Sequence, residues 1–414
     1  MLVLNGVVGA GIFALPGTLY ADFGAFSPWL IPLFGALVFL IAIPLGEVAG
    51  LFDRTGGPVA YAREAFGPFV SFQTGWAYYV TRLTAFAANT LVLVEYAAAI
   101  FPGLDEGFAR TALIVGVIAA ATAINVVGVR RALIVLDALS ILKIAPLLIV
   151  ALVGAVLYGP TSVEPVALPA FSDVERASLL ILYAFIGFES AVLAAGETKD
   201  PERTIPRALV ATLIATAGLY FLVQFAYAAT MTGEVVDKGP LVAFGEKLLG
   251  GPGAFVMLLA ALFSVAGNLL TIMLVTPRAA FALAADGQLP AWFGRVSARF
   301  ATPANSIVFL GALASLLALT GSFVALAVVS TLARLWVYVA SLAALPVIRR
   351  KRGLPPRRGV ARLLSPAILA GGLAFCLWAI AQSSAKSWAT FGALLLVGGA
   401  LYAVARLARA TGPS

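Results

Sequence analysis

The sequence contains no histidine and a single cysteine, Cys376, among its 414 residues. Catalysis by histidine and metal sites built on histidine are therefore excluded, and one thiol allows neither an internal disulfide nor a cysteine cluster for zinc. Charged side chains make up only 11% of the chain. An enzyme needs a convergent set of titratable groups, whereas the carboxyls here are scattered along the sequence. We therefore expect no enzymatic activity, no cofactor and no metal.

Hydrophobic residues, in contrast, make up 62% of the chain, and the mean hydropathy is +1.02. This composition is typical of an all-α integral membrane protein, whose long apolar helices cross the lipid bilayer. Runs long enough to span the membrane predict twelve transmembrane helices. The runs lie at about 2–20, 26–51, 71–101, 111–129, 132–158, 174–198, 206–232, 252–284, 303–321, 323–348, 363–382 and 387–408.

Arginine and lysine are distributed unevenly among the segments that connect these runs. When the N-terminus is placed inside, most of the 27 basic residues fall on the inner side of the membrane. The positive-inside rule then predicts a multi-pass protein of the cell membrane with both termini in the cytoplasm. This topology also accounts for the net charge of +8, because the basic run 349–362 would lie next to anionic lipid. No nucleic-acid partner is expected.

The first hydrophobic run is interrupted by Gly6, Gly9, Gly11 and Pro16. Each glycine costs a helix about 1 kcal/mol relative to alanine, and a break in lipid is tolerated only where it is buried in protein or lines a watery cavity. We therefore expect two half-helices in this run. The N–H groups at the start of the second half favour an anion such as a carboxylate. The alternative is a glycine-rich face for close helix packing.

The sixth run, at about 174–198, carries Gly187 close to the carboxyl of Glu189. An ionisable residue inside a span is costly, which makes Glu189 a candidate functional residue. A break at Gly187 would expose backbone carbonyls, and these attract a cation such as an ammonium group. The two breaks together predict a site for the carboxylate and the amine of an α-amino acid. A structural role for Glu189, hydrogen-bonded to a neighbouring helix, is the open alternative.

Five motifs occur in order, from the first run to the segment that follows the eighth. They are Gly9-Ala-Gly-Ile-Phe13 with Pro16; Glu47 with Gly56-Gly-Pro-Val-Ala-Tyr61 and Phe66-Gly-Pro68; Phe185-Ile-Gly-Phe-Glu189; Glu197-Thr-Lys-Asp-Pro-Glu-Arg-Thr-Ile-Pro206; and Arg278 with Asp286-Gly-Gln-Leu-Pro290. This series resembles prokaryotic amino acid permeases of the amino acid–polyamine–organocation (APC) superfamily.

The resemblance implies a leucine-transporter-like core of five-plus-five inverted repeats, in which helices 1 and 6 are broken. Residues 1–158 would form the first repeat, residues 174–348 the second, and residues 363–408 two extra helices. The site would lie between the two broken helices and open alternately to the two sides of the membrane.

The resemblance also implies roles for individual residues. Amides of the first broken helix would hold the substrate carboxylate, and carbonyls of the sixth would hold its amine. Tyr183 falls where similar permeases place an aromatic lid, with packing in the core or at the membrane interface as the alternative. The substrate-binding residues implied in this way are Gly9, Ala10, Gly11, Ile12, Tyr183, Phe185, Ile186, Gly187 and Ile272.

Lys143 lies deep in the fifth run, too far from either membrane surface to snorkel easily. Burial disfavours the charged form of a lysine, which suits proton exchange. In similar permeases a lysine of this span occupies the place where sodium-coupled relatives bind a cation. The resemblance therefore implies sodium-independent transport, with Lys143, Asn268 and Glu189 as proton-coupling residues. A fixed cation that ties the fifth span to the first is the open alternative.

Arg82 and Arg334 lie inside the third and tenth runs. Each could bind an acidic substrate or pair with Glu95 or Glu189, and a structural ion pair is the favoured interpretation. Apolar Ile272 and the lack of a clear acidic partner favour neutral substrates over cationic ones. The sequence thus predicts a proton-coupled secondary transporter of L-amino acids, with amino acid exchange and the transport of polyamines or cationic amino acids as alternatives.

Overall fold

The computed structural model describes residues 9–52, 56–128, 132–159, 167–189, 200–236, 239–355 and 361–411. Within these ranges the chain forms α-helices and 3-10 helices, and no β-strand. The α-helices are α2 (Ala10–Phe23), α3 (Ser27–Gly50), α4 (Gly57–Phe66), α5 (Pro68–Ala98), α6 (Gly107–Val127), α7 (Ala132–Tyr158), α8 (Phe171–Phe185), α10 (Pro201–Thr230), α11 (Pro240–Ala285), α12 (Ala304–Thr320), α13 (Phe323–Lys351), α14 (Ala361–Ala381) and α15 (Ala385–Thr411). The 3-10 helices are η1 (Gly24–Phe26) and η3 (Ala291–Gly294).

Each hydrophobic run of the sequence overlaps one of these helices. The limits of α7 coincide with those of the fifth run, whereas in the first and sixth runs the helix covers only part of the described stretch. Seven helical segments of the described chain are long and apolar enough to cross a membrane. The helical, multi-pass character is therefore supported, while the full set of twelve spans and the inverted repeat stay predictions.

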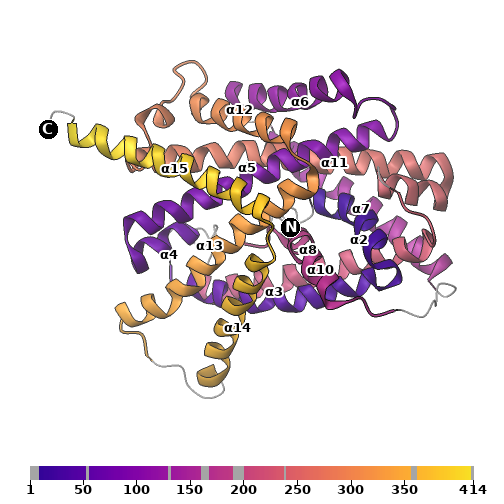
Figure 1. Ribbon diagram of the computed structural model, residues 1–414, viewed down its shortest axis with the longest axis horizontal. Helices are drawn as coiled ribbons and strands as arrows, with labels where there is room; N and C mark the ends of the chain where they lie inside the picture. The colour runs from indigo at the N-terminus through magenta and orange to yellow at the C-terminus, as the bar shows by residue number, and fades with distance from the viewer. Residues whose placement is uncertain are drawn as a thin grey trace.

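Helix α5 forms the centre of the bundle. It packs along α13 and α11 and also contacts α4, α12 and α15. Figure 1 shows the pair α6 and α12 on one side of α5 and the pair α3 and α10 on the other, and both pairs are in direct contact. Helices α14 and α15 lie on the outside of this arrangement. The core of the molecule therefore lies between α2, α5, α8, α11 and α13.

The central position of α5 is unexpected from its composition, because this helix carries many polar residues. Four of its threonines, Thr74, Thr81, Thr84 and Thr90, are buried and donate hydrogen bonds of 2.8–3.1 Å to carbonyls one turn earlier. A hydroxyl that is satisfied within its own helix can be buried at little cost. These local bonds let a polar helix occupy the middle of the protein.

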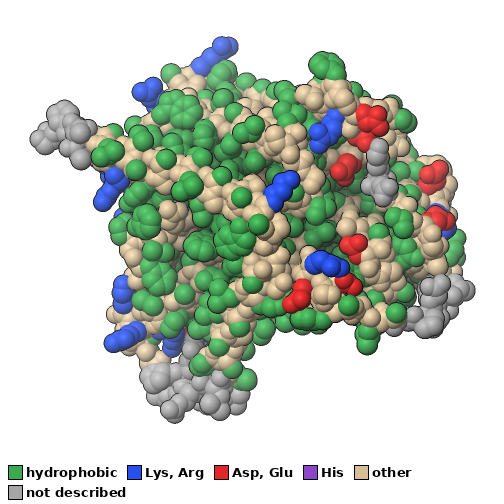
Figure 2. Space-filling model, viewed as in Figure 1, with side chains coloured by type: hydrophobic (Ala, Val, Ile, Leu, Met, Phe, Trp, Pro, Cys, Tyr) green, Lys and Arg blue, Asp and Glu red, His purple; other side chains and the backbone are tan. Residues whose placement is uncertain are grey.

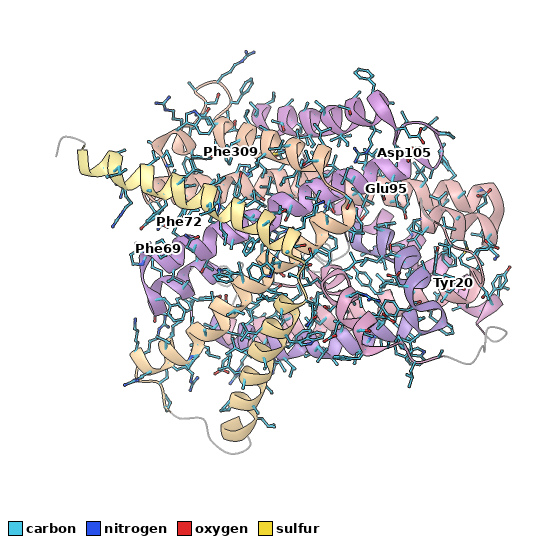
Figure 3. The ribbon with its side chains drawn as sticks, viewed as in Figure 1. Tyr20, Phe69, Phe72, Glu95, Asp105 and Phe309 are labelled. Carbon is cyan, nitrogen blue, oxygen red and sulfur yellow. The ribbon has the colours of Figure 1, made fainter. Side chains whose placement is uncertain are left out.

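The two ends of the molecule differ in charge. On the face shown in Figure 2, acidic side chains gather toward one end of the long axis, and the opposite end shows basic side chains without acidic ones. Figure 3 places Tyr20, Glu95 and Asp105 toward the acidic end and Phe69 and Phe72 toward the basic end. This separation agrees with the predicted outer and inner sides of the membrane, respectively.

Candidate functional site

Helix α2 begins inside the protein, at Ala10. The residue before it, Gly9, has φ −122° and ψ −148°, and as a glycine it has no side chain to cap the helix. Ala10 and Ile12 are 1% and 4% exposed. The first N–H groups of a helix have no acceptor within the helix, so this end presents buried donors and the positive end of the helix dipole. The half-helix predicted before Gly9 lies outside the described residues.

Helix α8 ends at Phe185, although the hydrophobic run continues. Ile186 is extended, with φ −64° and ψ 133°, and Gly187 has φ 120°, a backbone conformation that glycine adopts readily. The structure thus ends the helix next to Gly187, and the half-helix predicted after it lies outside the described residues. The carbonyls of the last helical turn lack partners further along the helix, so this end is the negative end of a dipole.

The two helix ends meet at Gly11. A Cβ atom placed on Gly11 would lie 3.3 Å from the Cα atom of Ala184 and 3.6 Å from Cδ1 of Tyr183. The missing side chain of Gly11 therefore permits the contact, as the close-packing interpretation of the glycines expected. The same contact brings two dipole ends of opposite sign together. A zwitterion matches this pair of ends, because its carboxylate suits the start of α2 and its amine suits the end of α8.

Tyr183 contacts Gly11 on α2 and packs on Phe323, a residue that lines a pocket. Its hydroxyl donates to Oδ1 of Asn89 at 3.3 Å, and its ring meets that of Phe323 edge-on with the centroids 5.8 Å apart. Phe323 lines a pocket of about 840 Å³, a volume that includes its open mouth, together with Ala14 and Glu95. Figure 3 shows Glu95 toward the acidic end of the molecule. Tyr183 is thus packed in the core against a residue that lines this pocket, and its role as a lid stays a prediction.

Glu189 follows the break of α8 and is held by three groups. It forms an ion pair with Arg334 of α13, accepts a hydrogen bond of 2.9 Å from the hydroxyl of Tyr338, and accepts one of 3.0 Å from the amide of Gly187. Glu189 and Arg334 are 2% and 1% exposed. The structure therefore shows the hydrogen-bonded structural arrangement that was the alternative for Glu189. A role of this carboxyl in proton coupling stays a prediction.

Arg82 of α5 has a different environment. Its Nε and Nη2 atoms donate to the hydroxyl of Tyr78 at 3.1 and 2.9 Å. The guanidinium carbons of Arg82 and Arg334 each lie 5.3 Å from the centre of the Tyr78 ring. Arg82 and Glu95 are separated on one straight helix by roughly 20 Å of rise, which excludes the pairing considered from the sequence. In the described part of the chain, Arg82 forms no ion pair.

The remaining predicted residues lie on α11 and α7. Ile272 is buried, and Asn268, one turn before it, is partly buried on the same side of α11. Helix α11 packs against α2, α5 and α7. Lys143 belongs to α7, but its side chain lies outside the described residues. Among the predicted residues, the structure therefore brings Gly11 together with Tyr183, while the contacts of Asn268 and Ile272 with this site stay predictions.

Several residues of the site were missed by sequence reasoning. Tyr78 and Asn89 contact Arg82 and Tyr183, respectively, and Phe323 packs on Tyr183. A signal existed on α5, because Tyr78, Arg82 and Asn89 are spaced by four and seven residues and so lie on one side of a helix. No comparable signal marks Phe323, which lies in an apolar run of α13.

Two helix ends that meet inside a bundle of membrane helices form the kind of site found in secondary transporters. The chain belongs to the amino acid permease family of the APC superfamily, whose family model matches residues 1–400.

Its relatives are transporters rather than enzymes. The chain is 28% identical over 413 residues to an uncharacterized transporter of Mycobacterium tuberculosis, covering 98% of this chain and 89% of the relative. It is 25% identical over 424 residues to the methylthioribose transporter of Bacillus subtilis, covering 97% and 90%. It is 26% identical over 369 residues to the serine/threonine exchanger SteT of Bacillus subtilis, covering 84% and 82%.

Proposed function

We propose that this protein is a secondary active transporter of L-amino acids in the cell membrane, with both termini in the cytoplasm. The observation that carries the proposal is the contact of the buried start of α2 with the end of α8 at Gly11. The substrate carboxylate accepts hydrogen bonds from the amides of Ala10, Gly11 and Ile12. Its ammonium group donates to carbonyls of Phe185, Ile186 and Gly187.

The transport cycle is alternating access around this fixed site. One group of helices rocks against the other within the five-plus-five repeat, and α2 and α8 bend at their breaks. Tyr183 closes the site toward the pocket lined by Phe323, on which its ring packs, and its amphipathic ring suits a barrier that is dry on one side and wet on the other. Buried, apolar Ile272 favours neutral side chains. The cationic Arg82 and Arg334 disfavour polyamines and cationic amino acids.

Transport is independent of sodium and coupled to protons through Lys143, with Asn268 and Glu189 as its assisting residues. A lysine deep in a membrane span loses its proton more easily than one in water, which allows exchange within a cycle. Obligate exchange of amino acids is the second candidate, favoured by the similarity to a protein named a serine/threonine exchanger. The two candidates share one site and differ in how the carrier returns, which is empty in proton symport and loaded with internal substrate in exchange.

Purified protein in liposomes tests this proposal. A thermal-shift screen against the twenty amino acids selects the ligands, and uptake of the labelled ligand is then measured with a pH gradient, with internal amino acid, and with sodium. Proton symport predicts uptake driven by the gradient alone, whereas exchange requires internal substrate. The Lys143→Ala variant should lose the response to the gradient and transport more slowly, with Lys386→Ala on α15 as the control. The absence of transport of any amino acid would overturn the proposal.

A further inference from the structure

Arg82 differs from its neighbours on the central helix α5 in its solvent exposure. Every residue of α5 from Thr74 through Val92 is buried except Arg82, which is partly accessible. Because other helices surround α5 along its length, a single accessible position opens into a gap between helices rather than onto lipid. Arg82 is therefore the residue of this stretch that keeps some solvent exposure although helices surround it.

Among the described residues, no carboxylate compensates the charge of Arg82. The charge of Arg334 is balanced by Glu189, whereas within the described ranges Arg82 meets a neutral phenol and no carboxylate. A guanidinium carries five N–H donors, and the Tyr78 hydroxyl takes bonds from Nε and Nη2 only. A cation inside a membrane protein is costly unless it is paired. The site thus has donors and positive charge available for an anion that arrives from outside.

Arg82 lies on the side of α5 that faces the break of α8. Asn89, seven residues further along the same helix, accepts the hydrogen bond from Tyr183, and the rise between Arg82 and Asn89 is about 10 Å. On its other side, Arg82 shares the Tyr78 ring with Arg334, whose partner Glu189 is bonded to the amide of Gly187. Arg82 is thus connected to the proposed amino acid site through Asn89 on its own helix and through Tyr78, Arg334 and Glu189.

We propose that Arg82 binds a carboxylate on the side chain of the substrate, so that the transporter accepts aspartate and glutamate. The Tyr78 hydroxyl accepts both hydrogen bonds from Arg82, which leaves its own proton to donate to the same carboxylate. This inference rests on the proposed amino acid transport and extends its substrates from neutral to acidic side chains. A charge-assisted contact of this kind discriminates strongly between a carboxylate and the amide of equal shape.

Uptake of L-glutamate and L-glutamine into proteoliposomes provides the test, since the two substrates differ by one group and share one shape. We expect wild-type protein to transport both, and Arg82→Gln to lower the ratio of glutamate to glutamine uptake at least about tenfold, the loss of one charge-assisted contact. Arg82→Lys should restore part of the ratio because it restores the charge. Arg295→Gln, at an exposed position after η3, is the control and should leave the ratio unchanged. Size-exclusion profiles verify that each variant is folded.

The outcomes separate this inference from the proposed function. Transport of glutamine without glutamate by the wild type, or an unchanged ratio in Arg82→Gln, overturns the inference alone. An equal loss of both substrates in Arg82→Gln, without rescue by lysine, also overturns it, because that result assigns Arg82 a purely structural role. Failure to transport any amino acid overturns the proposed function and this inference together.

Discussion

Glu189 and Arg334 form an ion pair that is almost completely shielded from solvent, between the break of α8 and the middle of α13. The hydroxyl of Tyr338 and the amide of Gly187 complete the bonding of the carboxylate. The segment that follows α8 is thereby attached to α13 at one point. In the proposed transport cycle α8 bends at this place, and the attachment to α13 would hold one side of the bend.

Neutralising one partner of this ion pair should destabilise the protein more than neutralising both partners. In Glu189→Gln or Arg334→Gln one buried charge stays without its partner, and a loss of about 3–5 kcal/mol is typical for that situation. The double variant leaves two neutral groups and should recover a large part of the loss. Thermal unfolding in detergent measures the three variants. Asp286→Asn, which removes the exposed pair with Arg63, should change the stability by less than about 1 kcal/mol. Additive losses in the double variant would contradict the coupling.

Gly11 should tolerate no side chain without a loss of substrate affinity. A methyl group there would press on the Ala184 backbone at 3.3 Å and separate the two helix ends that are proposed to hold the substrate. We expect Gly11→Ala to weaken binding about tenfold, equivalent to ~1.4 kcal/mol, and Gly11→Val to abolish it. Binding is measured by isothermal titration with the ligand found in the thermal-shift screen.

Gly116 on α6 provides the matched control for Gly11. Nothing lies within 4 Å of a Cβ atom at this position. Gly116→Ala should therefore bind substrate like the wild type, with stability equal or higher by up to about 1 kcal/mol because alanine favours helix. An affinity of Gly11→Ala equal to that of Gly116→Ala would refute the placement of the carboxylate at the start of α2.

The start of α2 and the approximate end of α8 were predictable from the sequence, because glycine disfavours helix at both places. Gly9 and Gly187 interrupt apolar runs, and the structure ends or begins a helix within two residues of each. The end of α8 at Phe185 was not readable, because Ile186 and Phe188 are as apolar as the helix before them. Hydrophobicity predicts the length of a run, and it does not distinguish helical from extended backbone inside that run.

The partners of the charged residues were readable only in part. Glu189 was correctly considered for Arg334, because both lie well inside apolar runs and each needs an opposite charge. The contacts of Tyr183 with Asn89 and Phe323 depend on how three helices are rotated against each other. That rotation is set by packing over the whole length of each helix, so a short stretch of sequence does not predict it.

Tyr183 should act mainly through its ring. Tyr183→Phe removes the hydrogen bond of 3.3 Å to Asn89 and retains the edge-on contact with Phe323, so we expect the KM to rise by no more than about fivefold, equivalent to a bond of ~1 kcal/mol. Tyr183→Ala removes the ring that is proposed to act as the lid. This variant should still bind substrate but should no longer accumulate it. Uptake kinetics and ligand binding, measured in parallel, separate these effects. Equal uptake by Tyr183→Ala and wild type would exclude the lid.

Glu64 of α4 and Arg352, next to the end of α13, form a bidentate ion pair in which both N–O distances are 2.7 Å. The hydrogen bonds from Arg352 hold the pKa of the Glu64 carboxyl below its usual value. A lowered carboxyl pKa adds stability at pH values above the pKa of the unfolded chain, and this stability is lost as the pH falls through the lowered value. Since the pair is partly exposed, the contribution at pH 7 should be within about 1 kcal/mol.

The comparison of Glu64→Gln with wild type at two pH values checks this interaction. At pH 7 the variant should unfold at a slightly lower temperature, and toward pH 4 and below the difference should disappear, because the wild-type carboxyl then becomes protonated as well. Glu246→Gln, at an exposed position of α11, should show no difference at either pH. A difference that grew on acidification would mean that Glu64 is stabilised in its protonated form, which is opposite to the arrangement of its two bonds with Arg352.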